Sequence, residues 1–420
     1  MSGWTARGLA LELLAIGLGS WIVFHNLRAH VAERYAIPSR SMEPTLHGDP
    51  RDGDRVLVDK TAFWSSPLWS WHRRPLRRHD LIVLRNRHQR DGAHLVKRFI
   101  AQGPAELALR EGDLFIKEGE QRTLERDVKH PLEQAGYRQT AFVVDPAARA
   151  VESGVLVGQD AVDGDALVLA ALPRDALVAQ LTPQAQAARR TQRPPTQQLA
   201  GFLRTGAAID TAFLDATGEL LAIRRGEVRD VGLELELALD AGVESLLLVL
   251  EAVEVYHALE YSAAGRLRCS VMGASAGEEL VVPSLPLGRT LRLAYGYLDG
   301  RLFVIADGVL IAWFEHAVEF RSPRELLPGE TFERPEANLL HLGVAGTGRV
   351  RITRARGFHD VHWQPRSESF RLEPGELFVL GENSYDSSDS RDHPGDAFRI
   401  EDLVGRPIGV LAPASRRRWL

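Results

Sequence analysis

Residues 37–46 read IPSRSMEPTL, and this stretch holds two serines two positions apart, Ser39 and Ser41. In an extended chain, residues two apart point to the same side. One hydroxyl could then act as a nucleophile while the other donates a hydrogen bond to the same reacting group. Pro38 and Pro44 flank the pair, and a Ser- and Pro-rich loop is the alternative that this segment alone leaves open.

A serine nucleophile needs a base, and the next suggestive segment is HLVKRFI at residues 94–100. Lys97 lies there among apolar residues, and burial lowers the pKa of a lysine because it disfavours the charged form. A useful base needs a pKa of ~7–8 instead of ~10.4, a shift that costs ~3–4 kcal/mol and that burial can supply. Taken alone, the segment favours the alternative, a strand-edge lysine with its ammonium in water.

A third segment, GENSYDSSDSR at residues 381–391, is dense in Ser, Asp and Asn. Such a composition is typical of a turn. Its hydroxyls and carboxylates could equally orient a neighbouring lysine and hold a buried arginine.

Residues 8–24 are apolar apart from Glu12 and Ser20, and they lie at the short end of the length that spans a bilayer. Trp4 and Trp21 stand near the two ends, where interfacial aromatics belong. We expect an uncleaved membrane anchor over residues 1–27. A cleaved signal peptide is disfavoured because no small-x-small site follows before His25, and a buried core helix is the third interpretation.

The rest of the chain predicts two folded domains. We expect a first catalytic segment at 28–120, a connecting region at 121–199 with a polar linker at 182–198, an inserted domain at 200–365 and a second catalytic segment at 366–420. Residues 231–239 (VGLELELAL) alternate strictly, and Asp299-Gly300 and Asp307-Gly308 are hairpin turn signals. Short strands are expected at 55–58, 81–84, 245–251, 255–261, 289–298, 301–305, 309–314, 339–344 and 350–354, which favours an antiparallel sandwich for the inserted domain.

Taken together, these segments resemble the conserved boxes of bacterial type I signal peptidases. IPSRSMEPTL is similar to the serine box of that family, and RRHDLIVLRN (77–86) followed by HLVKRFIA (94–101) is similar to its lysine box. DGDRVLVDK (52–60), GDLFIKEGE (112–120), GENSYDSSDSR (381–391) and IEDLVGRP (400–407) resemble further boxes in the same order. The resemblance covers roughly residues 8–120 and 371–410.

The resemblance implies a role for each matching residue. Ser41 is the expected nucleophile and Lys97 the expected general base, while Ser39 and the backbone N–H of Ser41 form the expected oxyanion hole. The supporting residues are Ser387, which hydrogen-bonds the lysine, the ion pair of Asp389 and Arg391, and Met42, which lines the substrate groove.

The implied fold is mostly β: a signal-peptidase-type catalytic domain with an N-terminal transmembrane helix. It carries an inserted antiparallel β-sandwich that resembles a concanavalin-like jelly roll, as in planctomycete-type members. The sequence departs from the family pattern at three places. Glu382 replaces the usual Asp, His79-Asp80 stands where Gly-Asp is usual, and residues 102–106 follow the usual loop only loosely.

The implied activity is removal of signal peptides from exported preproteins through an acyl-enzyme, with no cofactor and no metal. The implied location is the inner (cytoplasmic) membrane, single-pass, with the catalytic domain on the outer side. Preproteins and membrane lipid are the expected partners, together with an unidentified ligand of the sandwich. The net charge of −5 gives no support to a nucleic-acid partner.

Several alternatives stay open at this stage. The chain could be an anchored jelly-roll binding module with an inactive protease remnant, whereas the anchor disfavours a self-cleaving Ser–Lys repressor. In the sandwich, His359, Asp360 and His362 could bind a metal, but alternating histidines are usually structural. Trp313, Trp363 and Tyr256 could stack on a sugar, but core packing is the simpler interpretation. The single cysteine, Cys269, excludes an intrachain disulfide.

Overall fold

The structure, a computed structural model of the 420-residue chain, describes residues 6–63, 75–88, 93–110, 112–119, 121–134, 138–144, 156–157, 162–163, 166–182, 202–205, 213–221, 228–252, 255–272, 277–318, 339–364 and 369–420. It divides into two compact units. Unit 1 comprises Met1–Glu125 and Trp363–Leu420, and unit 2 comprises Arg126–His362. Unit 1 is therefore assembled from two segments that are far apart in the sequence.

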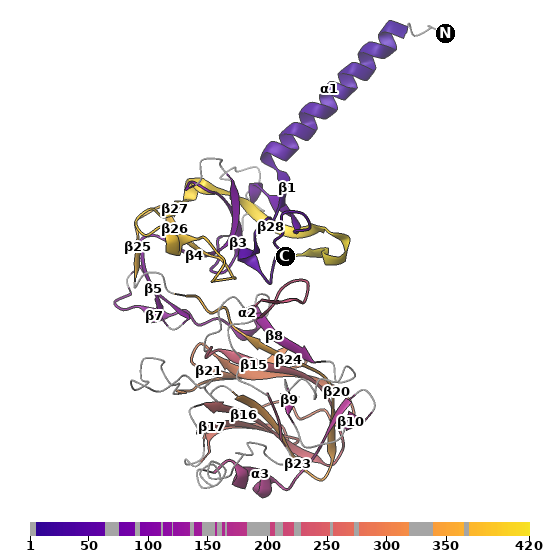
Figure 1. Cartoon of the computed structure of the whole chain (residues 1–420), viewed down its shortest axis with the longest axis vertical. Helices are drawn as coiled ribbons and strands as arrows, with labels where there is room; N and C mark the ends of the chain where they lie inside the picture. Colours follow the sequence, from indigo (N-terminus) through magenta and orange to yellow (C-terminus); the bar gives the residue numbers. More distant parts are fainter. Residues whose placement is uncertain are drawn as a thin grey trace. The chain divides into compact units, whose positions relative to one another are not determined.

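A long helix, α1 (Ala6–His30), precedes strand β1 (Ala32–Ala36) (Figure 1). Its side chains Leu14, Ile16 and Trp21 are 70%, 65% and 62% exposed, so α1 is not a buried core helix. Judged by length and apolar character together, none of the described helices qualifies as a membrane span, and the transmembrane helix expected here is not confirmed.

The two segments of unit 1 share one antiparallel sheet. Strand β28 (Leu403–Ala412) of the second segment pairs with β2 (Arg55–Asp59) and β3 (Leu81–Arg85) of the first. Strand β26 (Glu376–Leu380) pairs with β4 (His94–Gln102) in the same way. Strands β3 and β4 pair with each other, and the second segment supplies the partner on the other edge of each.

Buried apolar side chains from β3 fall into two separate clusters. Ile82 and Leu84 belong to one cluster and Val83 to the other, as the alternation of a strand requires. Burial on both faces explains the unbroken apolar run LIVL at the centre of unit 1. The other elements of unit 1 are η1 (Arg40–Met42), η2 (Thr61–Phe63), β5 (Ala105–Arg110), β6 (Asp113–Glu118), β25 (Phe370–Leu372), η7 (Ser390–Asp392), β27 (Phe398–Arg399), η8 (Ile400–Asp402), η9 (Ala414–Arg416) and β29 (Arg418–Trp419), and β7 (Glu125–Arg126) lies at its boundary.

Unit 2 is built around strand β15 (Val231–Leu239), whose bounds match the predicted alternating run. Leu233, Leu235 and Leu237 are fully buried, while the glutamates between them are half-buried. The alternation predicted from sequence is thus confirmed. The turns at Asp299 and Asp307 adopt positive φ at the Asp and at the following Gly, which the tight hairpins require.

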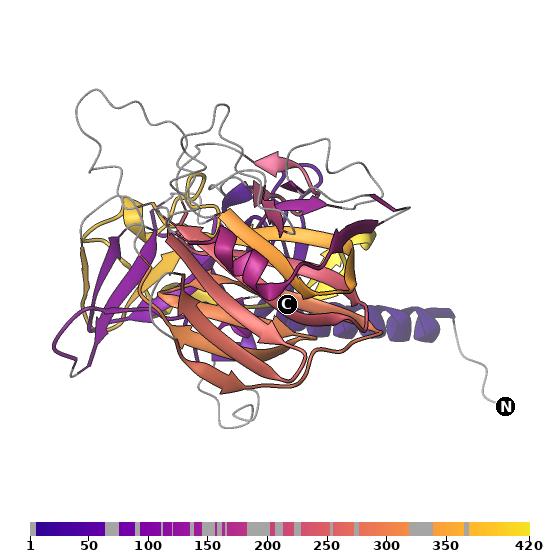
Figure 2. The same ribbon diagram turned by 90° about the horizontal axis from the view of Figure 1, so that it is seen from below.

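Two antiparallel sheets of unit 2 enclose one apolar core that includes Leu235, Leu248 and Leu293. Figure 1 shows the layers, with β15 and β24 in one and β16 and β23 in the other. Helix α3 (Arg174–Gln180) covers the second sheet, as Figure 2 shows, and buries Leu177 against Leu247. The other elements of unit 2 are α2 (Pro131–Gln134), β8 (Gln139–Val144), β9 (Leu156–Val157), β10 (Val162–Asp163), β11 (Ala166–Ala170), β12 (Phe202–Thr205), β13 (Phe213–Leu214), β14 (Leu220–Leu221), β16 (Val243–Ala252), β17 (Val255–Ser262), β18 (Arg266–Val271), β19 (Glu279–Val281), β20 (Thr290–Leu298), β21 (Arg301–Ala306), β22 (Val309–Glu315), β23 (Leu339–Gly346) and β24 (Arg349–His359).

The mostly β class with antiparallel sheets is confirmed, and every predicted strand run coincides with an observed strand. Almost all of the polar linker predicted at 182–198 lies outside the described residues.

A buried ion triad joins the two ends of unit 2. Lys129 Nζ, near the start, lies 2.9 Å from Asp299 Oδ1 and 2.8 Å from Asp360 Oδ2, near the end. All three side chains are at most 3% exposed. The chain therefore enters and leaves unit 2 at neighbouring points.

Replacing Lys129 with Met should lower the free energy of unfolding of unit 2 by about 3–5 kcal/mol, because two buried carboxylates would lose their cation. Chemical denaturation followed by near-UV circular dichroism measures this loss. The matched control is Arg268→Met, which breaks the exposed pair with Glu279 and should cost under about 1 kcal/mol. Equal losses in the two variants would contradict the role of the triad.

Candidate active site

The serine loop, residues 37–48, places two hydroxyls side by side. Ser41 lies in the 3₁₀ turn η1, and Ser39 precedes it in an extended conformation with φ −123° and ψ 151°. Ser39 Oγ donates to Ser41 Oγ at 3.4 Å. Ser41 is 8% exposed, whereas Ser39 is exposed. The turn after Ser39, rather than the alternation of one extended strand, brings the two hydroxyls together.

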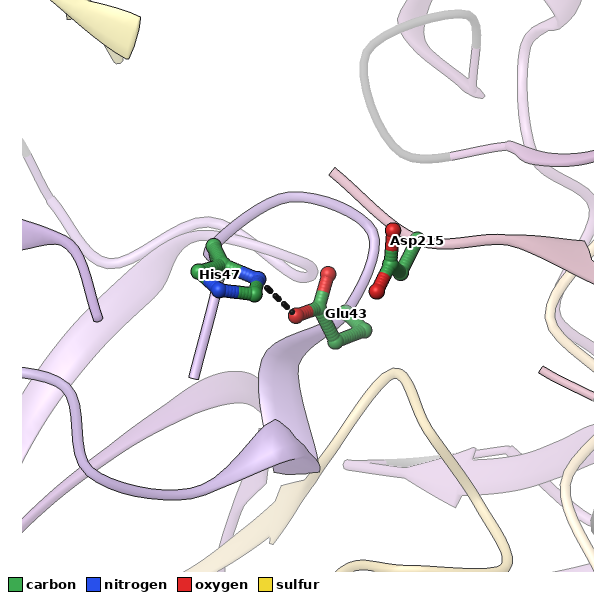
Figure 3. Close-up of side chains that lie close together, drawn as sticks. All are labelled: Glu43, His47 and Asp215. Atoms are coloured by element: carbon green, nitrogen blue, oxygen red, sulfur yellow. Dashed lines mark hydrogen bonds and ion pairs between the residues drawn. The ribbon is translucent and has the colours of Figure 1, made fainter. Parts of the chain in front are cut away.

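Buried polar contacts hold the serine loop in shape. Glu43 Oε1 lies 2.9 Å from His47 Nδ1 and accepts the backbone N–H of Gly48 at 3.1 Å (Figure 3). A Cβ at Gly48 would lie 1.7 Å from the carbonyl oxygen of Ser39, so only glycine fits there. Glu43 and His47 were missed from the sequence, where their only signal is a spacing of four residues. Asp215, also drawn in Figure 3, belongs to unit 2.

Lys97 lies in the middle of β4, directly opposite Ile82 of β3. The side chain is 1% exposed. Burial lowers the pKa of Lys97 to about 8, against a smaller opposing effect of the negative charge of Asp389. A substantial fraction of Lys97 is therefore neutral near pH 8 and able to accept a proton.

The Ser/Asp loop, residues 381–391, holds the amine of Lys97. Lys97 Nζ donates to Ser387 Oγ at 3.0 Å, and Ser387 Oγ donates to Asp389 Oδ2 at 2.7 Å. Arg391 donates hydrogen bonds from Nε and Nη2 to the two carboxylate oxygens of Asp389, each at 2.8 Å. Burial by itself would raise the pKa of Asp389, but the hydrogen bonds and charge of Arg391 outweigh it and lower that pKa. The carboxylate stays ionised and fixes the Ser387 hydroxyl.

Gly381 and Asn383 connect the Ser/Asp loop to the serine loop. A Cβ at Gly381 would lie 2.1 Å from Ser387 Oγ and 2.7 Å from the carbonyl oxygen of Ser41. Both groups therefore approach the Cα of Gly381 closely, and a larger residue would clash with them. The backbone N–H of Asn383 donates to that carbonyl at 3.1 Å. In the part of the chain that the structure describes, Ser41 and Lys97 lie in this common neighbourhood without a hydrogen bond between Ser41 Oγ and Lys97 Nζ.

A second buried ion pair joins the lysine strand to both loops. Arg98 Nε donates to Glu382 Oε1 at 2.7 Å, and Glu382 Oε2 accepts the backbone N–H of Thr45 at 3.2 Å. Glu382, a departure from the family pattern, thus retains an anion that binds this arginine. Arg98 also donates to the carbonyl of His79 at 2.6 Å. His79, another departure, has φ +68°, the left-handed conformation that the usual glycine adopts freely and that histidine tolerates.

Most of the remaining candidate residues are buried, while Trp313 and His362 are half-buried. Met42 is 1% exposed and belongs to the apolar cluster that contains Val96. Trp363 is 1% exposed and donates its indole N–H to the carbonyl of Gly381 at 3.3 Å, while Tyr256 is part of the core of unit 2. His359 Nδ1 lies 2.6 Å from the carbonyl of Asp360, whose carboxylate contacts Lys129.

The contacts of Lys97 generate a test of its electrostatics. Asp389→Asn should lower the pKa of Lys97 below about 8, because the variant removes an attractive anion and leaves Arg391 uncompensated. The chain has four lysines, so incorporation of ¹³C-labelled lysine allows the Cε shift of Lys97 to be followed with pH. Asp386→Asn, in the same loop but exposed, should move it less. A pKa that rises in Asp389→Asn would exclude this arrangement of charges.

Solved structures similar to part of the chain include galectin LEC-6 of Caenorhabditis elegans, 12% identical, which covers 31% of this chain and 84% of its own with a TM-score of 0.24. The carbohydrate-binding module CBM66 of Bacillus subtilis is 14% identical and covers 32% of this chain and 79% of its own, with a TM-score of 0.23.

Curated relatives match a shorter region. Signal peptidase I of Mycobacterium tuberculosis is 31% identical over 91 residues, which are 18% of this chain and 31% of that protein. Probable signal peptidase I of Mycobacterium leprae is 48% identical over 59 residues, 14% of this chain and 19% of that protein. The chain thus spans about a third or less of the length of these relatives. Residues 10–167 match the family described as "Signal peptidase, peptidase S26", and this match together with the curated relatives supports the type I signal peptidase family for that part of the chain.

Proposed function

We propose that this protein is a membrane-bound serine endopeptidase that removes N-terminal signal peptides from exported preproteins. The single observation that carries the proposal is the state of Lys97: 1% exposed, bound to Ser387 Oγ at 3.0 Å and with its pKa lowered to about 8. Unlike Lys129, this amine has no ion pair among the described contacts, so its burial costs stability that no partner charge offsets directly. It is suited to accept a proton near pH 8.

In the proposed reaction, neutral Lys97 accepts the proton of Ser41 Oγ as that oxygen attacks the scissile carbonyl carbon. The Ser39 hydroxyl and the backbone N–H of Ser41 donate to the oxyanion. When the tetrahedral intermediate collapses, the ammonium of Lys97 returns the proton to the departing amine. Water then attacks the ester with Lys97 again as base, which releases the signal peptide and restores Ser41.

Among the described contacts, Ser41 Oγ and Lys97 Nζ are not hydrogen-bonded to each other. Catalytic hydrogen bonds are often long in a free enzyme and tighten when substrate excludes water. Ser387, Asp389 and Arg391 support the proposal as a positioning chain, because they hold the amine of Lys97 from the side of the Ser/Asp loop. We assign Met42 to the lining of the substrate groove, next to the nucleophile in sequence.

Helix α1 is the proposed membrane anchor, with the catalytic domain outside the cytoplasmic membrane. Its exposed Leu14, Ile16 and Trp21 would cost little in lipid and much in water. Unit 2 is proposed to be the inserted sandwich-like domain. If α1 anchors the chain, the full-length protein should remain in the membrane pellet after an alkaline carbonate wash. Its release into the wash would contradict the anchor and leave the active-site proposal untouched.

Cleavage of a labelled preprotein in detergent tests the dyad. Ser41→Ala and Lys97→Met should each lower kcat/KM by at least about 10³-fold, because each removes a group that takes part in bond formation or proton transfer. The controls are Ser388→Ala, an exposed serine beside Ser387, and Lys117→Met, a lysine in a partly exposed ion pair. Both controls should cleave like the wild type.

If the wild type and all four variants behave alike, the chain is not an enzyme of this kind. The alternative, an anchored binding module with an inactive protease remnant, would then remain.

The rate of cleavage should also depend on pH in a definite direction. Lys97 must be neutral to act as base, so kcat/KM should rise tenfold per pH unit below the pKa of about 8 and level off above it. A pH–rate profile of the wild type measures this. A profile that falls between pH 6 and 8 would exclude a neutral lysine as the base.

A further inference from the structure

A cysteine and two histidines meet in unit 2, and none of them is among the residues assigned to proteolysis. Cys269 lies in β18, His257 in the neighbouring strand β17, and His316 directly after β22 of the other sheet. Cys269 Sγ is 3.7 Å from His316 Nδ1. The other ring nitrogen of that histidine, Nε2, is 2.7 Å from His257 Nδ1. These contacts join the two sheets near their edges.

The sulfur-to-nitrogen distance has the length expected for two ligands of one zinc ion. With Zn–S of ~2.3 Å and Zn–N of ~2.0–2.1 Å, a tetrahedral site separates the two donor atoms by ~3.6 Å. The partner of His316 Nε2 also fits, because a histidine that binds a metal usually donates its remaining ring N–H to a second group. His257 Nδ1 is placed to accept that hydrogen bond.

A cavity opens beside this pair and supplies further donors. Its volume is about 170 Å³, and its lining includes Cys269, His316, Glu278 and Glu315. Both carboxylates belong to exposed side chains in the lining of the cavity.

We propose that Cys269 and His316, with a carboxylate of Glu278 or Glu315, form a zinc site in unit 2, and that His257 is the positioning residue behind it. Binding replaces the thiol proton of Cys269 by the metal and releases it to solvent. A mixed sulfur, nitrogen and oxygen set favours zinc over calcium or magnesium.

Titration of the untagged, metal-free full-length protein with Co²⁺ tests the site. We expect one equivalent to bind with a thiolate-to-cobalt charge-transfer band, and excess Zn²⁺ to abolish that band. Cys269 is the single cysteine of the chain, so the band can arise nowhere else. It should be absent in Cys269→Ser and His316→Gln and present in His30→Gln, an exposed histidine of α1.

The variant His257→Leu tests whether His257 positions His316 for metal binding. The band should persist at saturation while the affinity for Co²⁺ falls by about 10–100-fold, since an outer hydrogen bond is lost but no ligand is. Should a variant fail to fold, protection of the wild-type thiol replaces it: Zn²⁺ should slow the modification of Cys269 by a maleimide.

Absence of the charge-transfer band in the wild type, or cobalt binding without it, would overturn the proposal. Unchanged maleimide reactivity in the presence of Zn²⁺ would do the same. None of these outcomes bears on the cleavage of preproteins, which is assayed with different residues.

Discussion

The candidate active site depends on one buried amine and the hydroxyl that holds it. Lys97 is almost completely enclosed, and its hydrogen bond to Ser387 is all that fixes the position of its amine among the described contacts. The ion pair behind Ser387 has two consequences. Asp389 orients the hydroxyl, while Arg391 offsets the negative charge that would otherwise raise the pKa of Lys97. A carboxylate without its arginine would keep the lysine protonated and unable to act as a base.

This arrangement explains why unit 1 needs two distant segments. Lys97 comes from the first segment and Ser387 from the second, 290 residues later. The pairing of β4 with β26 brings them together, and Gly381 then leaves room for Ser387 beside the carbonyl of Ser41. An insertion between the segments is compatible with such a sheet only if its own ends lie close together. Lys129 and Asp360 meet this condition within unit 2.

Short sequence patterns predicted many of the strands and turns, because alternation and turn residues act on the backbone of their own segment. The alternation at residues 231–239 became β15, and the Asp-Gly turns appeared where their positive φ values are needed. Motifs also singled out the chain of contacts from Lys97 to Arg391 before any geometry was known. Other features could not be predicted from the sequence, because they depend on a residue far away in the chain or on the backbone conformation. The role of Glu382 depends on its ion pair with Arg98. His79 can replace glycine only because its backbone tolerates the left-handed region.

The sequence by itself determined which residue types are present, where the strands run and which family the chemistry resembles. It could not determine whether Lys97 is charged, because an isolated strand with an apolar neighbourhood is equally compatible with an ammonium in water. Only the tertiary structure decided that question, since burial arises when the sheet closes over the amine. A pKa measures the difference in solvation between two protonation states, and solvation belongs to the folded environment rather than to the residue.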